Sequence, residues 1–258
     1  MKKRAPRDKV KVTTSSSSVE HFPKMVAFFG PDGAGKSTQA ELLVLFLEAK
    51  GFKVKKAWVR STHTIAYLLW LVFYKLNLCE DRSGFLNKMR KGFAVSYLNE
   101  NLYGVVSPIT MSPPRLKGGF SYFLWSAVEL LGIVPVIILQ VYVPLLLGRV
   151  VVAERYVVDS IASIAYFLGD VGFSRSWQAR FLLSFIPKRT VFVFVDADYD
   201  TISLRRGFVS GPREYTEFHR RLYFELSRKV GAFYINTQRD SVSVANQKIL
   251  NYIFLNRG

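Results

Sequence analysis

Eight residues near the start of the chain have the types and spacing needed to hold a triphosphate. The segment GPDGAGKS at 30–37 satisfies the pattern G-x-x-x-x-G-K-S/T. In this pattern the glycines let backbone N–H groups turn inward around a phosphate, the lysine reaches the β- and γ-phosphates, and the hydroxyl can bind Mg²⁺. A chance glycine-rich turn is the weaker alternative, because an apolar run precedes the motif and a helical pattern follows it. The sequence therefore predicts an ATP site with Lys36 as a catalytic cation and Ser37 as a metal ligand, formed by Gly30, Pro31, Asp32, Gly33, Ala34, Gly35, Lys36, Ser37 and Thr38.

A carboxylate and a guanidinium follow a second apolar run. Glu154, Arg155 and Tyr156 come directly after Val150–Ala153. At the carboxyl end of a parallel strand, Glu154 can hold Mg²⁺ or its water, and Arg155 can bridge two anionic substrates. The alternative is an ion pair at a strand end. We expect Glu154 to be a metal ligand and Arg155 to be a catalytic residue.

Arginines gather in residues 205–221, beside a helical pattern. Apolar side chains recur there at spacings of three and four, at Tyr215, Phe218, Leu222 and Leu226. With Gly207 and Gly211 as pivots, this segment can close over ATP and neutralise charge on the γ-phosphoryl group. A solvated basic helix face is an equally good interpretation of Arg220 and Arg221. We expect a lid region over 205–221, with Arg206 and Arg213 as catalytic cations.

The elements that must position these residues alternate between strand and helix. Strands are predicted at 25–29, 53–59, 149–153, 190–195 and 232–235, and the first helix at 37–50. The third and fourth runs are continuously β-branched or aromatic, which is typical of strands covered on both faces. The predicted fold is therefore a P-loop three-layer α/β sandwich, with a five-stranded parallel sheet and ligands at the carboxyl ends of its strands.

Several other classes of chemistry are disfavoured. The segment at 236–240 lacks the Asn-Lys-x-Asp spacing that reads guanine, which argues against a small GTPase. One cysteine, Cys79, and three separated histidines do not supply a recognisable zinc cluster. No Ser-His-Asp set and no paired carboxylates for acid–base work are visible, and phosphoryl transfer needs neither.

Taken together, these motifs resemble the thymidylate kinase family of P-loop nucleoside monophosphate kinases. The resemblance lies in GPDGAGKSTQ at 30–39, in ERY at 154–156, where the family usually has Asp-Arg-Tyr or Asp-Arg-His, and in FVDAD and LRRG between 194 and 207. It implies that Asp32 contacts the acceptor sugar and that Arg155 lies between the two phosphates. It also implies that Arg60 binds the acceptor phosphate, that Tyr156 borders the acceptor, and that Arg205, Arg206 and Arg213 belong to the lid.

The sequence departs from the family in the region that would read the base. After Arg60 the family continues Glu-Pro-Gly, whereas this chain has Ser61-Thr62-His63-Thr64, and the family's Ser and Ala-Tyr positions after Arg155 do not align. Residues 61–148 are longer and more apolar than the family's base-binding region. We expect them to form a helical acceptor-binding insertion in a kinase domain at 23–258. Glu129 either projects into the acceptor site or pairs with a core arginine.

The amino-acid composition also indicates the cellular compartment and the kinds of binding partner. The 258 residues carry 36 Lys and Arg against 19 Asp and Glu, a formal charge of +17, which attracts polyanions without choosing among them. A single cysteine indicates a reducing compartment, and we expect the cytosol. Residues 1–22 are basic and serine-rich, and a disordered tail is favoured over a nucleic-acid or membrane tether. We expect the protein to bind nucleotides and not to bind nucleic acid. The sequence leaves open whether the chain forms a homodimer.

The apolar stretch at 130–148 raises the question of a membrane. It is near the length of a spanning helix, but Gly132, Pro135, Pro144 and Gly148 interrupt it. A buried, kinked helix that delivers the chain to a core strand is favoured over a spanning or interfacial helix, and peripheral membrane contact stays open.

The function expected from the sequence is the transfer of the ATP γ-phosphoryl group to dTMP, with Mg²⁺ as cofactor. Two alternatives are open. One is a kinase of the same fold that acts on another nucleotide or on a phosphorylated or lipid-like acceptor, and the other is a non-catalytic ATP-dependent binding protein.

Overall fold

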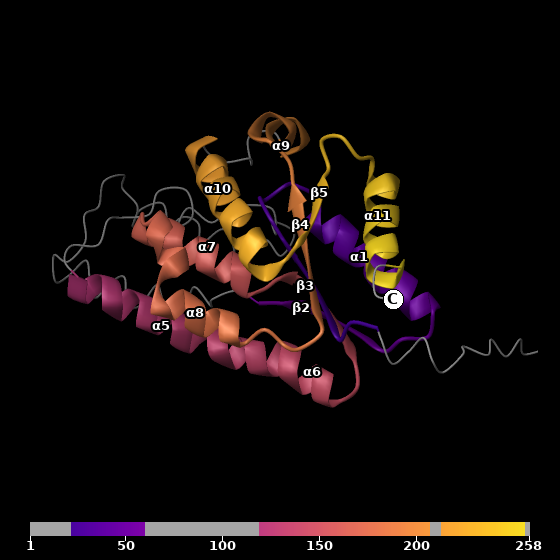
Figure 1. The fold of residues 1–258 in the computed structure, drawn as a ribbon, viewed down its shortest axis with the longest axis horizontal. Coiled ribbons are helices and arrows are strands. Elements are labelled where there is room, and N and C mark those ends of the chain that lie inside the picture. The colour runs from indigo at the N-terminus through magenta and orange to yellow at the C-terminus, as the bar shows by residue number, and fades with distance from the viewer. Residues whose placement is uncertain (1–21, 60–118, 207–212, 256–258) are drawn as a thin grey trace, which may run out of the picture.

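The computed structural model describes residues 22–59, 119–206 and 213–255, and a five-stranded parallel sheet lies at its centre (Figure 1). The order across the sheet is β2-β3-β1-β4-β5. The strands are β1 (Met25–Phe29), β2 (Val54–Trp58), β3 (Val150–Arg155), β4 (Thr190–Asp196) and β5 (Phe233–Asn236). Each begins and ends within two residues of the run that the sequence predicts. The predicted α/β fold is confirmed.

Helices cover both faces of the sheet, which gives three layers (Figure 1). One face carries α1 (Lys36–Ala49) and α11 (Val242–Leu255). The other carries α5 (Gly119–Ile137), α7 (Val157–Leu168), α8 (Trp177–Ser184) and α10 (Arg213–Val230). The short helices η3 (Val171–Arg175) and α9 (Tyr199–Arg206) connect neighbouring elements.

The central strands are buried on both faces, as their continuous apolar sequences require. In β1, Val26 and Phe28 pack toward α1 and α11, whereas Met25, Ala27 and Phe29 belong to the core on the opposite face. The register sets Val26 beside Val152 of β3 and beside Val191 of β4. This packing fixes where the carboxyl ends of β1 and β3 lie, and both predicted motifs are located at these ends.

A long apolar helix leads into β3 and corrects one expectation. α5 continues through the π-helix η2 (Ile138–Tyr142) into α6 (Val143–Leu146), so the predicted irregular helix before a core strand is present. It is not buried all round: Ile133, Ile137 and Val141 lie in the core, but Leu139 is 67% exposed and Leu146 is 86% exposed. Gln140 on η2 accepts a hydrogen bond from the backbone N–H of Trp58 on the edge strand β2 (2.8 Å). Within the described residues, Ser126–Leu146 is long and apolar enough to cross a membrane by length and composition.

The packed part of the chain begins at Phe22, the last residue of the expected tail. Phe22 is buried, and its ring centroid lies 4.8 Å from that of Phe52 and 5.0 Å from that of Phe254. The rest of the tail, Arg60, Cys79 and most of the expected acceptor-binding insertion lie outside the described residues.

Candidate active site

The glycine-rich segment between β1 and α1 has the backbone that a phosphate cradle requires. Gly30, Gly33 and Gly35 have φ angles of 139°, 94° and 97°, in the region that only glycine enters without strain. Gly35 is the N-cap of α1, so the first free N–H groups of that helix open onto the loop. The segment can therefore bind an anion through its backbone.

Gly30 is also held by close packing, which gives a first testable prediction. A Cβ atom at residue 30 would lie 2.0 Å from the backbone oxygen of Val195, whereas a Cβ at Gly51, which also has positive φ, would meet nothing within 4 Å. We expect Gly51→Ala to reduce the free energy of unfolding by about 1–2 kcal/mol and Gly30→Ala to reduce it by several times as much or to prevent folding. Urea denaturation of both variants tests this, and equal losses would contradict the clash.

Lys36 is buried inside the loop. Its side chain is 4% exposed, and its Nζ donates hydrogen bonds to the backbone oxygens of Gly30 (2.6 Å) and Pro31 (2.7 Å). Asp32 Oδ1 lies 3.3 Å from the same nitrogen. Burial lowers the pKa of Lys36, and the negative charge of Asp32 opposes that shift. The lysine is thus enclosed by oxygen acceptors in a position where a phosphate would replace them.

Arg155 joins the end of β3 to the same loop. Its guanidinium donates to Asp32 and lies 3.6 Å from Asp159 Oδ1 on α7. Burial alone would lower the pKa of Arg155, but the two carboxylates raise it, so the guanidinium stays charged. Lys36, Asp32, Arg155 and Asp159 therefore form one cluster of two cations and two anions. The cluster brings together the two motifs that are 123 residues apart in the sequence.

Asp159 is a site residue that sequence reasoning did not assign. It is 3% exposed, and it accepts hydrogen bonds from the hydroxyl of Tyr223 on α10 (3.0 Å) and from the backbone N–H of Tyr156 (3.4 Å). Burial raises the pKa of Asp159, and Arg155 opposes the shift. The sequence feature that could have indicated Asp159 is its position four residues after Arg155, at the start of a helix. Its other partner, Tyr223, comes from a distant helix, and no local sequence pattern links the two residues.

Ser37 and Glu154, the two predicted metal ligands, are in contact. The Ser37 hydroxyl donates to Glu154 Oε1, and Lys56 lies 3.9 Å from the other carboxylate oxygen. Hydroxyl and carboxylate oxygens are the donors that Mg²⁺ prefers, and Mg²⁺ usually takes few protein ligands together with substrate phosphates. Among the described residues, no three His, Cys, Asp or Glu side chains gather as a metal site. The pair therefore fits Mg²⁺ held jointly by protein and nucleotide.

A further hydrogen-bond network connects the glycine-rich loop to the segment that follows the edge strand β5. Thr237, after β5, donates its hydroxyl to the backbone oxygen of Ala34 (2.8 Å). Arg205 on α9 donates to the hydroxyl (3.0 Å) and backbone oxygen (2.6 Å) of Thr237. Arg206 lies against Gly33, since a Cβ at that glycine would be 2.6 Å from the Arg206 Cδ. Arg205 thus supports the loop, and Arg206 is the predicted lid arginine that contacts it.

The other lid arginines have different surroundings. Arg213 pairs with Asp200 and lies over the ring of Tyr199, so it joins α10 to α9 at the surface. Arg220 is not on a solvated face: it donates two hydrogen bonds of 2.8 Å to Asp196, a buried carboxylate at the end of β4. Arg221 is exposed. The lid segment between these helices, with Gly207 and Gly211, lies outside the described residues.

Tyr156 has a place in the core that differs from its expected role at the acceptor. It is 1% exposed, and its hydroxyl donates to the backbone oxygen of Phe185. Tyr156 is therefore a core residue and not part of an acceptor-binding surface in this structure. Arg60, expected at the acceptor phosphate, follows β2 outside the described residues.

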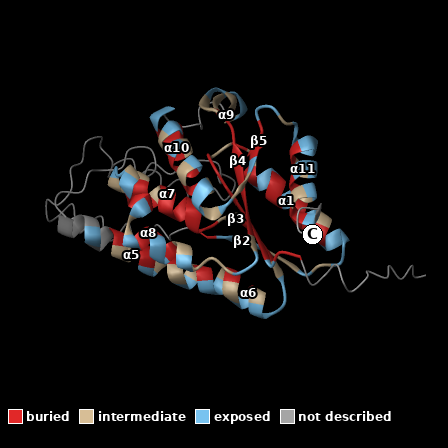
Figure 2. Ribbon diagram, in the orientation of Figure 1, coloured by how far each residue is buried: buried red, intermediate tan, exposed pale blue. Residues whose placement is uncertain are grey.

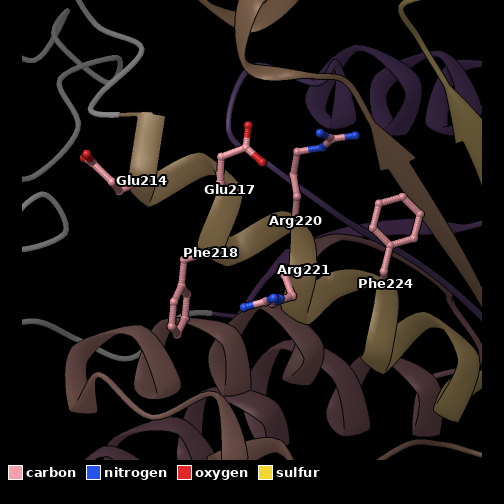
Figure 3. A pocket seen from close by; sticks show the side chains of 6 residues that line it. All are labelled: Glu214, Glu217, Phe218, Arg220, Arg221 and Phe224. Atoms are coloured by element: carbon pink, nitrogen blue, oxygen red, sulfur yellow. The ribbon is translucent and has the colours of Figure 1, made fainter.

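A hollow of about 550 Å³ lies on the outer side of α10 and is separate from the charged cluster. Its six lining side chains all come from this helix, and they include Phe218, Arg221 and Phe224 (Figure 3). The opposite side of α10 carries Tyr223, which reaches Asp159. The phosphate-binding geometry is thus located at the loop after β1 rather than in this hollow.

The parallel sheet with a glycine-rich loop after its central strand defines a P-loop fold, and solved structures of this fold resemble the chain. The chain is similar to the thymidylate kinase of Candida albicans, with 16% identity, a TM-score of 0.51, and coverage of 92% of this chain and 93% of that one. It is also similar to the thymidylate kinase of Ehrlichia chaffeensis, with 12% identity, a TM-score of 0.45, and coverage of 89% and 97%. No protein-family model and no curated protein sequence matches the chain. The resemblance expected from the motifs is confirmed at the level of the fold.

Proposed function

We propose that this protein is a nucleoside monophosphate kinase that transfers the γ-phosphoryl group of ATP to dTMP. The observation that carries the proposal is the contact between Asp32 of the loop after β1 and Arg155 at the end of β3. It puts a cation able to bridge two phosphates beside the cradle that would hold the donor phosphates. The fold likeness to a thymidylate kinase supports the same reaction class.

In the proposed reaction, a phosphate oxygen of dTMP attacks the γ-phosphorus, the bond from that phosphorus to the β–γ bridging oxygen breaks, and ADP and dTDP leave. The loop N–H groups and Lys36 hold the donor phosphates. Arg155 exchanges its contact with Asp32 for phosphate oxygens, and Asp159 keeps the guanidinium in place. Arg206, beside Gly33, adds positive charge above the loop. These residues act by positioning and by neutralising repulsion between two anions, without a covalent intermediate.

Mg²⁺ would be held by Ser37 and Glu154. When bound it neutralises charge on the β- and γ-phosphates. Lys56 near Glu154 adds a cation on the side of the carboxylate away from Ser37. A cytosolic location, where nucleotides are available and a lone cysteine stays reduced, is part of the same proposal.

An assay of ADP release against a panel of nucleoside monophosphates tests the proposal. We expect turnover that depends on dTMP and Mg²⁺ and that exceeds turnover with the other acceptors. Lys36→Met protein measured in parallel controls for contaminating kinases. ATP binding without turnover on any acceptor would contradict the proposal and would favour a binding protein.

A second candidate is a kinase of this fold with another acceptor. It is favoured by the sequence that follows β2, which lacks the Glu-Pro-Gly of thymidylate kinases, and by the apolar character of residues 61–148. The Candida albicans thymidylate kinase is itself described as having broad substrate specificity. Turnover with other monophosphates, or with a phosphorylated lipid-like acceptor, in preference to dTMP would support this candidate.

A further inference from the structure

The helix before β3 carries exposed apolar side chains along its length, and these form an apolar strip. Its exposed members are Phe123, Leu131, Ile138, Leu139, Val143, Leu146 and Leu147. Five of these seven lie between residues 138 and 147, so the exposed apolar surface is densest over η2 and α6. At about 1.5 Å per residue the strip is roughly 36 Å long. Figure 2 shows exposed positions alternating with buried ones along α5 and α6. A strip of this length is unusual on the surface of a monomeric soluble protein.

The opposite side of this helix is built into the core, which determines how the helix can meet a bilayer. Ile133, Ile137 and Val141 have no exposed surface and belong to the core cluster that includes Met25 and Ala153. Gln140 is held by the backbone of Trp58. A helix crossing the bilayer would have to leave this core and expose it. The helix is therefore suited to lie at a membrane surface with one side in lipid.

Cations stand beside one end of the apolar strip. Five exposed basic residues occupy the amino ends of four parallel strands, namely Lys24, Lys53, Arg149, Lys188 and Arg189. They are neighbours in space, because Lys24 N bonds Arg189 O, Val151 N bonds Lys24 O, and Val150 N bonds Lys53 O. Arg149 follows Leu147 by two residues. The negative charge of Glu48, at the end of α1, is balanced by the positive charge of Lys50 two residues later.

The basic tail comes directly before this edge in the sequence. Residues 1–20 contain six Lys and Arg against Asp8 and Glu20, and the tail leads into Phe22, two residues before Lys24. Each basic residue near an anionic membrane surface contributes about 1 kcal/mol to binding. The cations of the described residues thus lie at one end of the apolar strip, the basic tail precedes them in the sequence, and the positive charge selects an anionic partner.

We propose that the exposed side of this helix docks on a bilayer containing anionic lipids, with the apolar strip in the headgroup region and the cations on the lipid phosphates. In Figure 1 the helix lies along the lower margin and the β4 arrow points away from it. The P-loop follows the carboxyl end of β1, parallel to β4, so the nucleotide site faces away from the membrane. The docked protein keeps its loop open to soluble nucleotides.

Vesicle co-sedimentation of the full chain tests this proposal. We expect binding to phosphatidylcholine vesicles that contain phosphatidylglycerol, weaker binding to pure phosphatidylcholine, and release by high salt because the charges are screened. Leu139→Asp combined with Leu146→Asp should reduce the bound fraction at least about tenfold, because both side chains enter the lipid. Val244→Asp, at an exposed apolar position on α11, is the matched control and should bind as the wild type does.

Three outcomes would overturn the proposal. The first is no vesicle binding by the wild type. If the wild type is then a dimer that the double variant converts to monomers, which light scattering would detect, the strip is a self-association surface. The second is unchanged binding by the double variant. The third is binding that resists high salt and needs detergent for release, which would indicate a spanning helix. None of these results depends on kinase activity, and both variants should keep wild-type ATP turnover.

Discussion

Lys36→Met should reduce phosphoryl transfer about 10²- to 10³-fold while changing the free energy of unfolding by no more than about 1 kcal/mol. The lysine supplies the positive charge for the donor phosphates, and methionine keeps its buried stem. The substitution has two opposing effects on the free energy of unfolding. The backbone oxygens of Gly30 and Pro31 lose a donor, but a charge that burial disfavours is also removed. Asp32 keeps Arg155 as its partner.

Steady-state kinetics and urea denaturation together measure these two effects. Lys50→Met, an exposed lysine after the last residue of α1, is the matched control and should change neither. Wild-type kcat in Lys36→Met would remove the lysine from the mechanism. A variant that fails to fold would mean that the lysine is mainly a structural residue.

Arg155→Met should lose both activity and stability. Transfer should fall about 10³-fold or more, because an arginine between transferring phosphates has effects of that size. The free energy of unfolding should fall by about 3–5 kcal/mol, because the substitution leaves the buried carboxylate of Asp159 without its cation. Asp159→Asn in the same chain removes the buried charge and keeps an oxygen for the Tyr223 hydroxyl. The double variant should recover most of the stability and none of the activity.

The stability of Arg155→Met should also depend on pH in a defined direction. Burial raises the pKa of Asp159, and loss of Arg155 removes the main opposing influence. A carboxyl whose pKa is higher in the folded state binds its proton more tightly there, so folding gains stability as the pH falls. The deficit relative to wild type should be complete above the folded-state pKa of Asp159 in the variant and should shrink between that pKa and the lower folded-state pKa of Asp159 in the wild type, which is itself above the ordinary value.

Thermal unfolding of both proteins across this pH range measures the difference. A deficit that is constant with pH, or that grows toward acid, would show that Asp159 is not the source of the instability. In the Arg155→Met/Asp159→Asn double variant the pH dependence should be absent.

The sequence predicted the sheet and the phosphate loop because both follow from local patterns. Continuous apolar runs identify buried parallel strands, and the glycines of the loop need φ angles that few other residues adopt. The contact between Asp32 and Arg155 could also be predicted, because the carboxyl ends of neighbouring parallel strands meet at one edge of the sheet.

Other features depended on tertiary packing and could not be predicted. Asp159 is a site residue because Tyr223 comes from another helix, and Arg205 supports the loop because Thr237 lies after a distant strand. The apolar stretch at 130–148 was expected to be buried, but one side of the helix is exposed. Composition shows how apolar a helix is, but it does not show how much of the helix surface packs against other elements. Tyr156 was expected at the acceptor, but its hydroxyl bonds to Phe185 instead.

The hydrogen bond between Trp58 and Gln140 has a consequence for how copies of this chain can assemble. β2 is an edge strand, and an open edge offers backbone donors to any extended segment that pairs with it. Gln140 already occupies the donor at the last residue of β2, and η2 lies beside it. Sheet extension through this end of β2 is thereby blocked, which leaves the opposite edge strand, β5, and the helical surfaces as routes to an ordered oligomer.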